Sequence, residues 1–281
     1  MTFKHFIPAL AVCALASLPH IALAGPITYD PERIDTEYVD ESGLKHKFFN
    51  DIEAGISQGS SASLYSYSGM DDRSTLFDAD EEDVPVTVAR AWLSGQDCVY
   101  GCNLKAEARL EYEFMIEHDE YRTVDIDFNY MYSLRVNAAA EDISSNARVW
   151  GAVYNRWSQL QAPLINEGIW FNGDETRDFS IHDITKTLTL NTNEVYRISM
   201  RSYASIQLPL GNGNAYAEAI MDPLLSVSDS NLTGFNIRSS VLTETNGIEA
   251  GNAVADVPAP GTFALLALGL MGLFGRRMKN V

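Results

Sequence analysis

One short segment combines aromatic rings with arginines in a spacing that suits sugar binding. Segment 148–156 reads RVWGAVYNR, and in a β-strand every second side chain points to the same side. One side of that strand would carry Arg148, Trp150, Ala152, Tyr154 and Arg156. Rings can cover the apolar face of a sugar while planar guanidinium groups donate to its hydroxyls. The candidate glycan-binding residues are therefore Arg148, Trp150, Tyr154 and Arg156. The alternative is that Trp150 and Tyr154 are core residues, with the arginines extending from the core to solvent.

An acidic segment, 71–83, is a candidate calcium site. It reads DDRSTLFDADEED, and its candidate ligands are Asp71, Asp72, Asp78, Asp80, Glu81 and Asp83. Hard carboxylate oxygens on a flexible loop suit Ca²⁺, although the spacing is not that of an EF-hand. Calcium is the single cofactor that the sequence suggests, and the alternative is a solvated acidic loop that binds no metal.

The cysteines predict a disulfide. Cys98 and Cys102 lie in the segment CVYGC, and Cys13 lies near the N-terminus. Exported proteins meet an oxidising compartment, where such a pair is usually bridged, and Gly101 allows the short loop to bend. A metal site would need further ligands, and redox-active pairs usually have two intervening residues rather than three.

Catalytic motifs are missing from the sequence. None of His46, His118 and His182 has a metal-ligand spacing, and there is no G-x-S-x-G elbow, phosphate loop or dinucleotide fingerprint. The glutamates of segment 105–117 share one face of an expected strand, which we interpret as a solvated face. We therefore expect a non-enzymatic protein. The alternative is a glycosidase-like enzyme, which two carboxylates about 5–9.5 Å apart on a concave face would favour.

The elements that must position these residues are strands. Segments 105–117 and 124–136 alternate apolar and polar side chains with the period of two that is typical of half-buried strands. Further strands are expected at 61–67, 84–93, 147–157, 179–190, 196–208 and 215–220. We expect a hairpin connection at 118–121, turns at 172–174 and 210–214, and loops at 25–60, 68–83 and 158–178. The predicted fold class is all-β, an antiparallel β-sandwich with a jelly-roll-like arrangement.

The chain is strongly acidic, with a formal net charge of −18. Four of its basic residues, Lys4, Arg276, Arg277 and Lys279, lie in the terminal segments, so the part between them is more acidic still. Such a surface repels nucleic acid, and it repels anionic polysaccharide unless cations bridge the two. The simplest interpretation of this charge is solubility.

The N-terminus has the organisation of a secretory signal peptide. Lys4 precedes an apolar stretch, Phe6–Leu18, and Ala22-Leu23-Ala24 is a small-x-small cleavage site. Cleavage is expected between Ala24 and Gly25, so the secretion translocon and signal peptidase are expected partners. A lipoprotein signal at Cys13 is the alternative.

The C-terminus ends in an uncharged segment, 257–275, followed by Arg276 and Arg277. Its 19 residues would form a helix of about 28 Å, close to the thickness of a bilayer core. Basic residues beside a span tend to stay on the cytoplasmic side, which places the rest of the chain outside. A permanent tail anchor is one interpretation.

This tail resembles the PEP-CTERM protein-sorting signal. The motif is Val257-Pro258-Ala259-Pro260, a hydrophobic helix follows, and Arg276-Arg277 forms the basic end. Ala259 departs from the glutamate of the family name. The resemblance implies a Gram-negative, exopolysaccharide-producing host and an exosortase-type peptidase that removes the tail after a transient stay in the inner membrane. The final location would be the cell surface or the extracellular matrix of a biofilm.

Three parts of the chain follow from these patterns. Residues 1–24 are the signal peptide, 25–256 the exported β-sandwich domain, and 257–281 the sorting signal with a transmembrane helix at about 259–275. The expected function is a matrix or adhesion role, with extracellular polysaccharide as a partner. Nucleic acid is not an expected partner.

Overall fold

A computed structural model describes residues 27–56, 60–72, 83–95, 98, 101–139, 142–173, 175–227, 234–240 and 246–254. Throughout these ranges the chain forms strands and turns, with no helix. The strands are β1 (Ile27–Val39), β2 (Lys45–Ile56), β3 (Ser61–Asp72), β4 (Asp83–Gly95), β5 (Cys102–Glu117), β6 (Thr123–Ala139), β7 (Ser144–Asn155), β8 (Leu160–Asn172), β9 (Glu175–Asn191), β10 (Val195–Leu208), β11 (Gly213–Val227), β12 (Asn236–Ser239) and β13 (Asn246–Val254).

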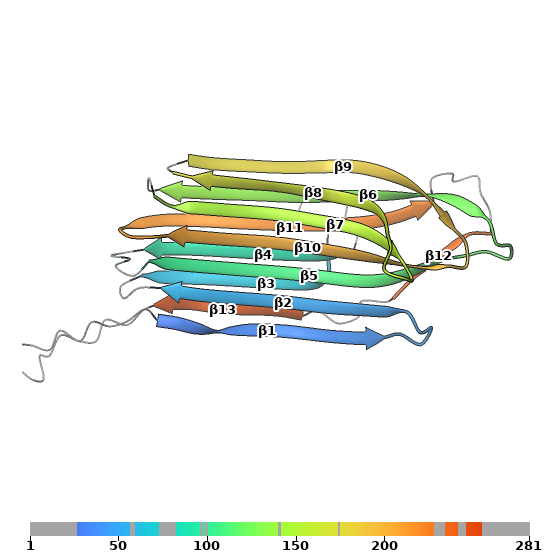
Figure 1. Cartoon of the computed structure of the whole chain (residues 1–281), viewed down its shortest axis with the longest axis horizontal. Helices are drawn as coiled ribbons and strands as arrows, with labels where there is room; N and C mark the ends of the chain where they lie inside the picture. Colours follow the sequence, from blue (N-terminus) through green and yellow to red (C-terminus); the bar gives the residue numbers. More distant parts are fainter. Residues whose placement is uncertain are drawn as a thin grey trace, which may run out of the picture.

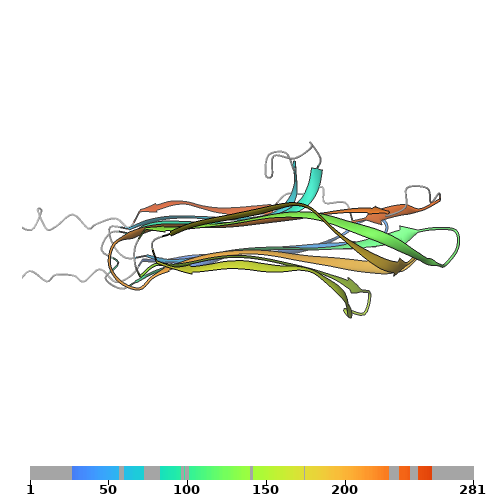
Figure 2. The ribbon, with the colours of Figure 1, turned by 90° about the horizontal axis from the view of Figure 1, so that it is seen from above.

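The strands form two antiparallel sheets. Sheet A has the order β1-β2-β5-β10-β7-β8, with β12 also paired to β5, and sheet B has the order β13-β3-β4-β11-β6-β9. Figure 2 shows the two sheets as separate layers, and Figure 1 shows the strands running along the length of the molecule. The expectation of an all-β fold with antiparallel sheets is therefore confirmed for the described residues, and the two layers are the arrangement of a sandwich.

The core lies between the two layers because alternating side chains of both sheets point inward. In β5 the alternation predicted from the sequence is present, with Leu104, Leu110 and Phe114 fully buried. Phe114 of sheet A packs edge-on against Phe128 of sheet B, with ring centroids 6.1 Å apart. Burial of these apolar side chains is the main stabilising contribution to such a fold.

The chain passes repeatedly from one sheet to the other. The connections β2–β3, β4–β5, β5–β6, β6–β7, β8–β9 and β10–β11 all join strands of different sheets. The hairpin expected at 118–121 is therefore wrong: this segment joins β5 of sheet A to β6 of sheet B. The late strands β10 and β11 each pair with two neighbours and lie centrally in their sheets.

Two of the expected loops are also wrong, because they contain strands. The segment 25–60 holds β1 and β2, and the segment 158–178 holds β8. In β8 the burial does not alternate with a period of two, and its pairing with β7 shifts register twice, after Gly151 and after Val153. The strands expected at 61–67, 84–93, 147–157 and 179–190 correspond to β3, β4, β7 and β9, although β7 ends at Asn155.

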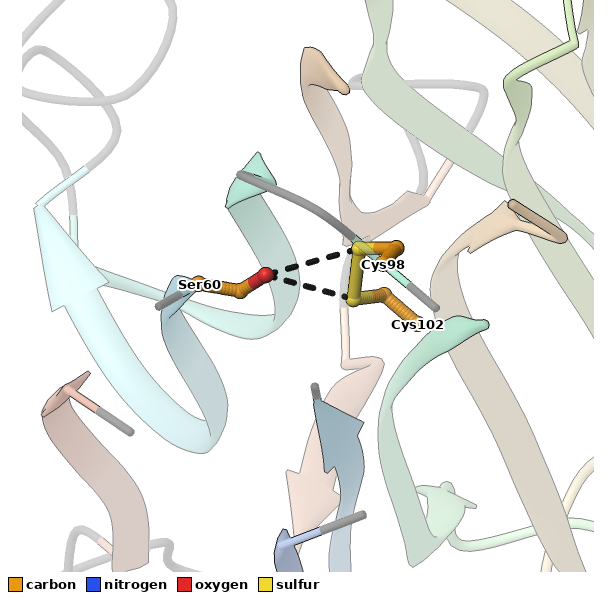
Figure 3. Close-up of a disulfide and its surroundings, with 3 residues drawn as sticks. All are labelled: Ser60, Cys98 and Cys102. Carbon is orange, nitrogen blue, oxygen red and sulfur yellow. Dashed lines mark hydrogen bonds between the residues drawn. A yellow bond between two sulfur atoms is a disulfide. The ribbon is translucent and has the colours of Figure 1, made fainter. Parts of the chain in front are cut away.

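The predicted disulfide is present and lies in the connection between the two layers. Cys98 and Cys102, with Cα atoms 5.9 Å apart, lie where the chain passes from β4 to β5. Both are buried, and the hydroxyl of Ser60 lies 3.4 Å from Cys98 Sγ and 3.6 Å from Cys102 Sγ (Figure 3). Since a disulfide sulfur carries no hydrogen, the Ser60 hydroxyl is the donor. Gly101 has φ +82°, the left-handed conformation that the tight loop requires.

The two targeting segments lie outside the described residues. These include the signal cleavage residues Ala22, Ala24 and Gly25, the motif 257–260, and the helix expected at about 259–275. Within the ranges that the structure describes, no helix is long and apolar enough to cross a membrane.

Candidate functional site

A depression of about 870 Å³ lies on the outer face of sheet A. Three adjacent strands, β5, β10 and β7, supply nearly all of its lining, and Ser158 in the turn after β7 completes it. The lining residues of these strands are Lys105, Glu107, Arg109, Glu111, Asn146, Arg148, Trp150, Tyr154, Arg197, Ser199, Arg201 and Tyr203.

The register between β7 and β10 places an arginine opposite an aromatic ring three times. Arg148 lies opposite Tyr203, Trp150 opposite Arg201, and Tyr154 opposite Arg197. Side chains directly opposite each other in an antiparallel pair have Cβ atoms about 5 Å apart, so each pair is in contact range. The result is a surface on which each of three rows across the two strands joins a cation to a ring.

Small residues lie between two of these rows and leave room. Ser199 lies opposite Ala152, between the row of Trp150 with Arg201 and the row of Tyr154 with Arg197. The rings of Trp150 and Tyr154 have centroids 6.4 Å apart with 46° between their planes, and Ala152 between them is fully buried.

Cation–π contacts hold two of the arginines. The guanidinium of Arg197 lies 5.3 Å from the ring centroid of Tyr154, and that of Arg201 lies 5.6 Å from the ring centroid of Tyr203. Such contacts fix the orientation of the guanidinium groups and leave their remaining N–H donors for other partners.

The two carboxylates of the depression are already bound. Glu107 accepts hydrogen bonds from Arg109 and Arg201, both at 2.9 Å, and it is only 4% exposed. Glu111 accepts from the Ser199 hydroxyl at 3.1 Å and lies 3.5 Å from Arg197. The interpretation of the glutamates of segment 105–117 as a solvated face is therefore wrong for Glu107, which arginines surround.

Positive charge exceeds negative charge in the depression. Five lining side chains are cationic and two are anionic. Partial burial lowers the pKa of Lys105, but the hydrogen bond and ion pair with Asp51 and the charge of Glu107 outweigh this, so that its pKa lies above the usual value and the amine stays charged. In a chain of net charge −18, this is a local reversal of potential.

Three of the four predicted glycan-binding residues line the depression. Arg148, Trp150 and Tyr154 do so, whereas Arg156 is exposed in the turn after β7 and lies outside the lining. Trp150 and Tyr154 are partly exposed on the outer face and are not members of the hydrophobic core. Glycan binding by these residues stays a prediction.

Sequence reasoning missed the contribution of β10. Arg197, Arg201 and Tyr203 alternate with the inward-facing residues of that strand, so their common face was readable from the sequence. Their position beside Arg148 and Trp150 was not readable, because it depends on the pairing of two strands far apart in the chain.

The proposed calcium ligands cannot be placed. Asp78, Asp80 and Glu81 lie outside the described residues, and the side chains of Asp71, Asp72 and Asp83 lie outside the described part as well. Among the side chains that are described, no group of three or more His, Cys, Asp or Glu could hold a metal ion.

Comparison with known families identifies the tail. Residues 256–279 match the family described as the PEP-CTERM protein-sorting motif. The match supports the resemblance read from the sequence and implies an exported protein handled by exosortase-type sorting machinery, with anchoring in a membrane during sorting. It covers the tail and leaves the sandwich unassigned.

The remaining comparisons assign nothing to the sandwich. No curated protein matches the chain. Eleven chains of solved structures match, among them one from a structure of infectious bursal disease virus Gx strain, at 7% identity over 90% of this chain and 91% of that chain, with a TM-score of 0.17. Another is the VP2 subviral particle of infectious bursal disease virus, at 8% identity over 91% and 89% of the two chains, with a TM-score of 0.14. Likenesses this weak carry no argument about this chain.

Proposed function

We propose that residues 25–256 form an exported, non-enzymatic adhesion protein that binds extracellular polysaccharide through the outer face of sheet A. Its location would be the cell surface or the biofilm matrix of an exopolysaccharide-producing Gram-negative bacterium, and its fold a jelly-roll-like sandwich. The observation that carries the proposal is the alternation of arginines and rings across β7 and β10, in a depression of about 870 Å³.

The depression has the two components that sugar binding needs. Partly exposed rings of Trp150 and Tyr154 offer apolar surface for the C–H face of a sugar. Guanidinium groups beside them offer planar sets of N–H donors for hydroxyl groups. All these side chains lie on strands, which hold their relative positions more firmly than a loop would.

The state of the two carboxylates supports binding rather than hydrolysis. Glu107 and Glu111 lie four residues apart on β5, which separates their backbone positions by about 13 Å. A glycosidase pair needs carboxyl groups about 5–9.5 Å apart, with one of them able to donate a proton. Here both groups accept hydrogen bonds from neighbouring side chains, and Glu107 has two arginine partners.

Replacing one ring tests the proposal. Trp150→Ala should weaken retention of the exported protein on polysaccharide extracted from its own matrix by about tenfold or more, because a central aromatic contact carries much of the binding energy of such a surface. The matched control is Trp92→Ala, which removes a partly exposed ring, 38% exposed, on the outer face of sheet B. Retention should be unchanged in the control.

Two outcomes would contradict the proposal. Equal loss of retention in Trp150→Ala and Trp92→Ala would show that the outer face of sheet A has no special role, provided that circular dichroism shows both variants folded. Loss of retention by the unmodified protein in the presence of a chelator, with no effect of Trp150→Ala, would favour calcium bridging through the acidic segment 71–83.

A further inference from the structure

We propose that the depression is specific for an acidic sugar, with the carboxylate of a uronic acid residue held between Arg148 and Arg201. This inference rests on the proposed binding of polysaccharide and names the chemical class of polymer that the same site would take.

Four side chains form the centre of the site. Arg148 and Tyr203 face each other in one row, and Trp150 and Arg201 face each other in the next row with the same orientation. The two arginines therefore lie on one diagonal of a square and the two rings on the other. Diagonal neighbours on a sheet face are about 7–8 Å apart at Cα. The two guanidinium groups point outward from this pair of strands, Arg148 toward Asn166 on β8 and Arg201 toward Glu107 on β5, so both side chains would turn inward to hold one carboxylate.

Arg148 has no acidic partner within the part of the chain that the structure describes. Its guanidinium donates to Asn166 Oδ1 at 2.7 Å, which is a neutral acceptor, and its side chain is exposed. By contrast, Arg109 on the far side of the depression pairs with Glu107 and also lies 4.9 Å from the ring centroid of Phe49. Among the described cations of the depression, Arg148 is the one without a carboxylate partner.

Arg201 supplies the second half of the anion site because its own counter-ion is shared. Glu107 receives hydrogen bonds from Arg109 and Arg201 and lies 3.8 Å from Lys105, so one negative charge serves three cations. Arg109 and Arg201 lie directly opposite each other, a like-charge pair that is unfavourable unless anions compensate it. A ligand carboxylate beside Arg201 would supply the missing compensation.

The chemistry of the two sets of groups fits a uronic acid. Its carboxylate projects from the edge of the sugar ring, so the ring can lie on an aromatic surface while the carboxylate reaches sideways. Trp150 and Tyr203 flank the two arginines and offer that surface. Arginine binds carboxylates through two parallel hydrogen bonds, which a hydroxyl group cannot reproduce. A neutral sugar would therefore leave Arg148 without a carboxylate partner.

Titration calorimetry with matched polymers tests this inference. The probes are three uronate polymers, namely polygalacturonate, alginate and a glucuronan, each compared with its carboxyl-reduced form in the presence of a chelator. We expect the exported protein to bind at least one uronate polymer ten times or more tightly than its reduced form. The difference should shrink as salt is raised, because exposed charges are screened.

A pair of arginine variants locates the site. Arg148→Gln should weaken uronate binding about tenfold, the effect expected for a charge-assisted hydrogen bond to a carboxylate. Arg238→Gln is the matched control, since it removes the same charge at an exposed position on β12 outside the depression. Thermal melts of both variants should be close to that of the parent protein, since both side chains are exposed.

The outcomes separate this inference from the function on which it rests. Equal binding of a uronate polymer and its reduced form would overturn the acidic specificity and leave polysaccharide binding standing. Binding to neutral polymers alone would do the same, and binding to no polymer of either kind would overturn both. Equal weakening by Arg148→Gln and Arg238→Gln would overturn the placement of the carboxylate, because net charge alone would then explain the loss.

Discussion

The outer faces of the two sheets both contain arginines, aromatic rings and glutamates, but in different arrangements. On sheet A, arginines lie opposite rings, and a depression remains between them. On sheet B, Tyr65, Arg90, Glu218 and Arg135 form a single row across four adjacent strands. There the carboxylate lies directly between two arginines.

The charged side chains of the row on sheet B bind partners within the protein. Arg90 Nε donates to Glu218, and the guanidinium lies 5.6 Å from the ring centroid of Tyr65. The hydroxyl of Tyr216 donates to Glu218 at 2.8 Å, and Glu218 is 7% exposed. Burial raises the pKa of the Tyr216 hydroxyl, and the charge of Glu218 raises it further, so this donor keeps its proton. Arg90, Tyr216 and Glu218 therefore have hydrogen-bond partners within the protein.

Arg148 and Arg90 show the difference most clearly. Arg148 lies opposite Tyr203 and Gly168, with no carboxylate opposite it, whereas Arg90 lies opposite Glu218. An arginine that binds a carboxylate of the protein has its N–H donors occupied. An arginine that has no carboxylate partner keeps donors for a ligand even beside a ring, because cation–π contact uses the face of the guanidinium and not its N–H groups. Removing a carboxylate from sheet B should therefore lower stability. Adding a carboxylate beside Arg148 on sheet A should weaken binding of the ligand.

The largest effect should come from removing the carboxylate of sheet B. Glu218→Gln leaves Arg90 partly buried without its counter-ion, which should lower the free energy of unfolding by about 2–3 kcal/mol, less than for a fully buried pair since Arg90 is 40% exposed. Urea unfolding measures this change. Arg148→Gln on sheet A should alter stability by less than about 0.5 kcal/mol, and similar losses in the two variants would show that the faces do not differ.

The disulfide tests whether the two faces depend on each other. It bridges the connection between β4, which carries Arg90, and β5, which carries Glu107. Replacing Cys98 and Cys102 by serine should lower stability by about 1–2 kcal/mol, because the bridge closes only a short loop. Affinity for polysaccharide, measured well below the melting temperature, should stay the same. A parallel loss of affinity would mean that the depression needs this link for its shape.

The smallest effect should come from placing a carboxylate beside Arg148 on sheet A, as Glu218 lies beside Arg90 on sheet B. Asn166→Asp places a carboxylate of nearly the same shape on the acceptor that binds Arg148. The arginine would then be paired within the protein, and binding of uronate polymers should weaken about threefold to tenfold while the melting temperature changes little. Asn137→Asp, an exposed position on β6, is the control for the added negative charge. Tighter binding in Asn166→Asp would contradict the role given to Arg148.

The sequence predicted the strands whose two faces differ most. β5, β6, β10 and β11 alternate between core and solvent, and their period of two is visible in the residues. Prediction from alternation failed for β8, because register shifts opposite β7 break the alternation and Pro163 interrupts the pattern. It failed for β1, an edge strand that needs fewer apolar residues than a central strand, and for β2.

The site was predictable one strand at a time. The face shared by Arg148, Trp150 and Tyr154 follows from alternation within β7. The neighbouring arginines and Tyr203 follow from the pairing of β7 with β10, which begins 40 residues after β7 ends. Such a register depends on packing of the whole core, and no local pattern encodes it.

The position of β10 and β11 along the chain has a consequence for how the protein forms. Each strand joins two otherwise separate parts of its sheet, and both come after residue 194. A chain that is being exported from its N-terminus would therefore expose unpaired strand edges until its last third has emerged. Folding dominated by such distant pairings is slow, and unpaired edges are prone to aggregation. An incomplete translation product that stops before β10 would lack the centre of both layers, so only nearly complete chains could assemble the β7–β10 face.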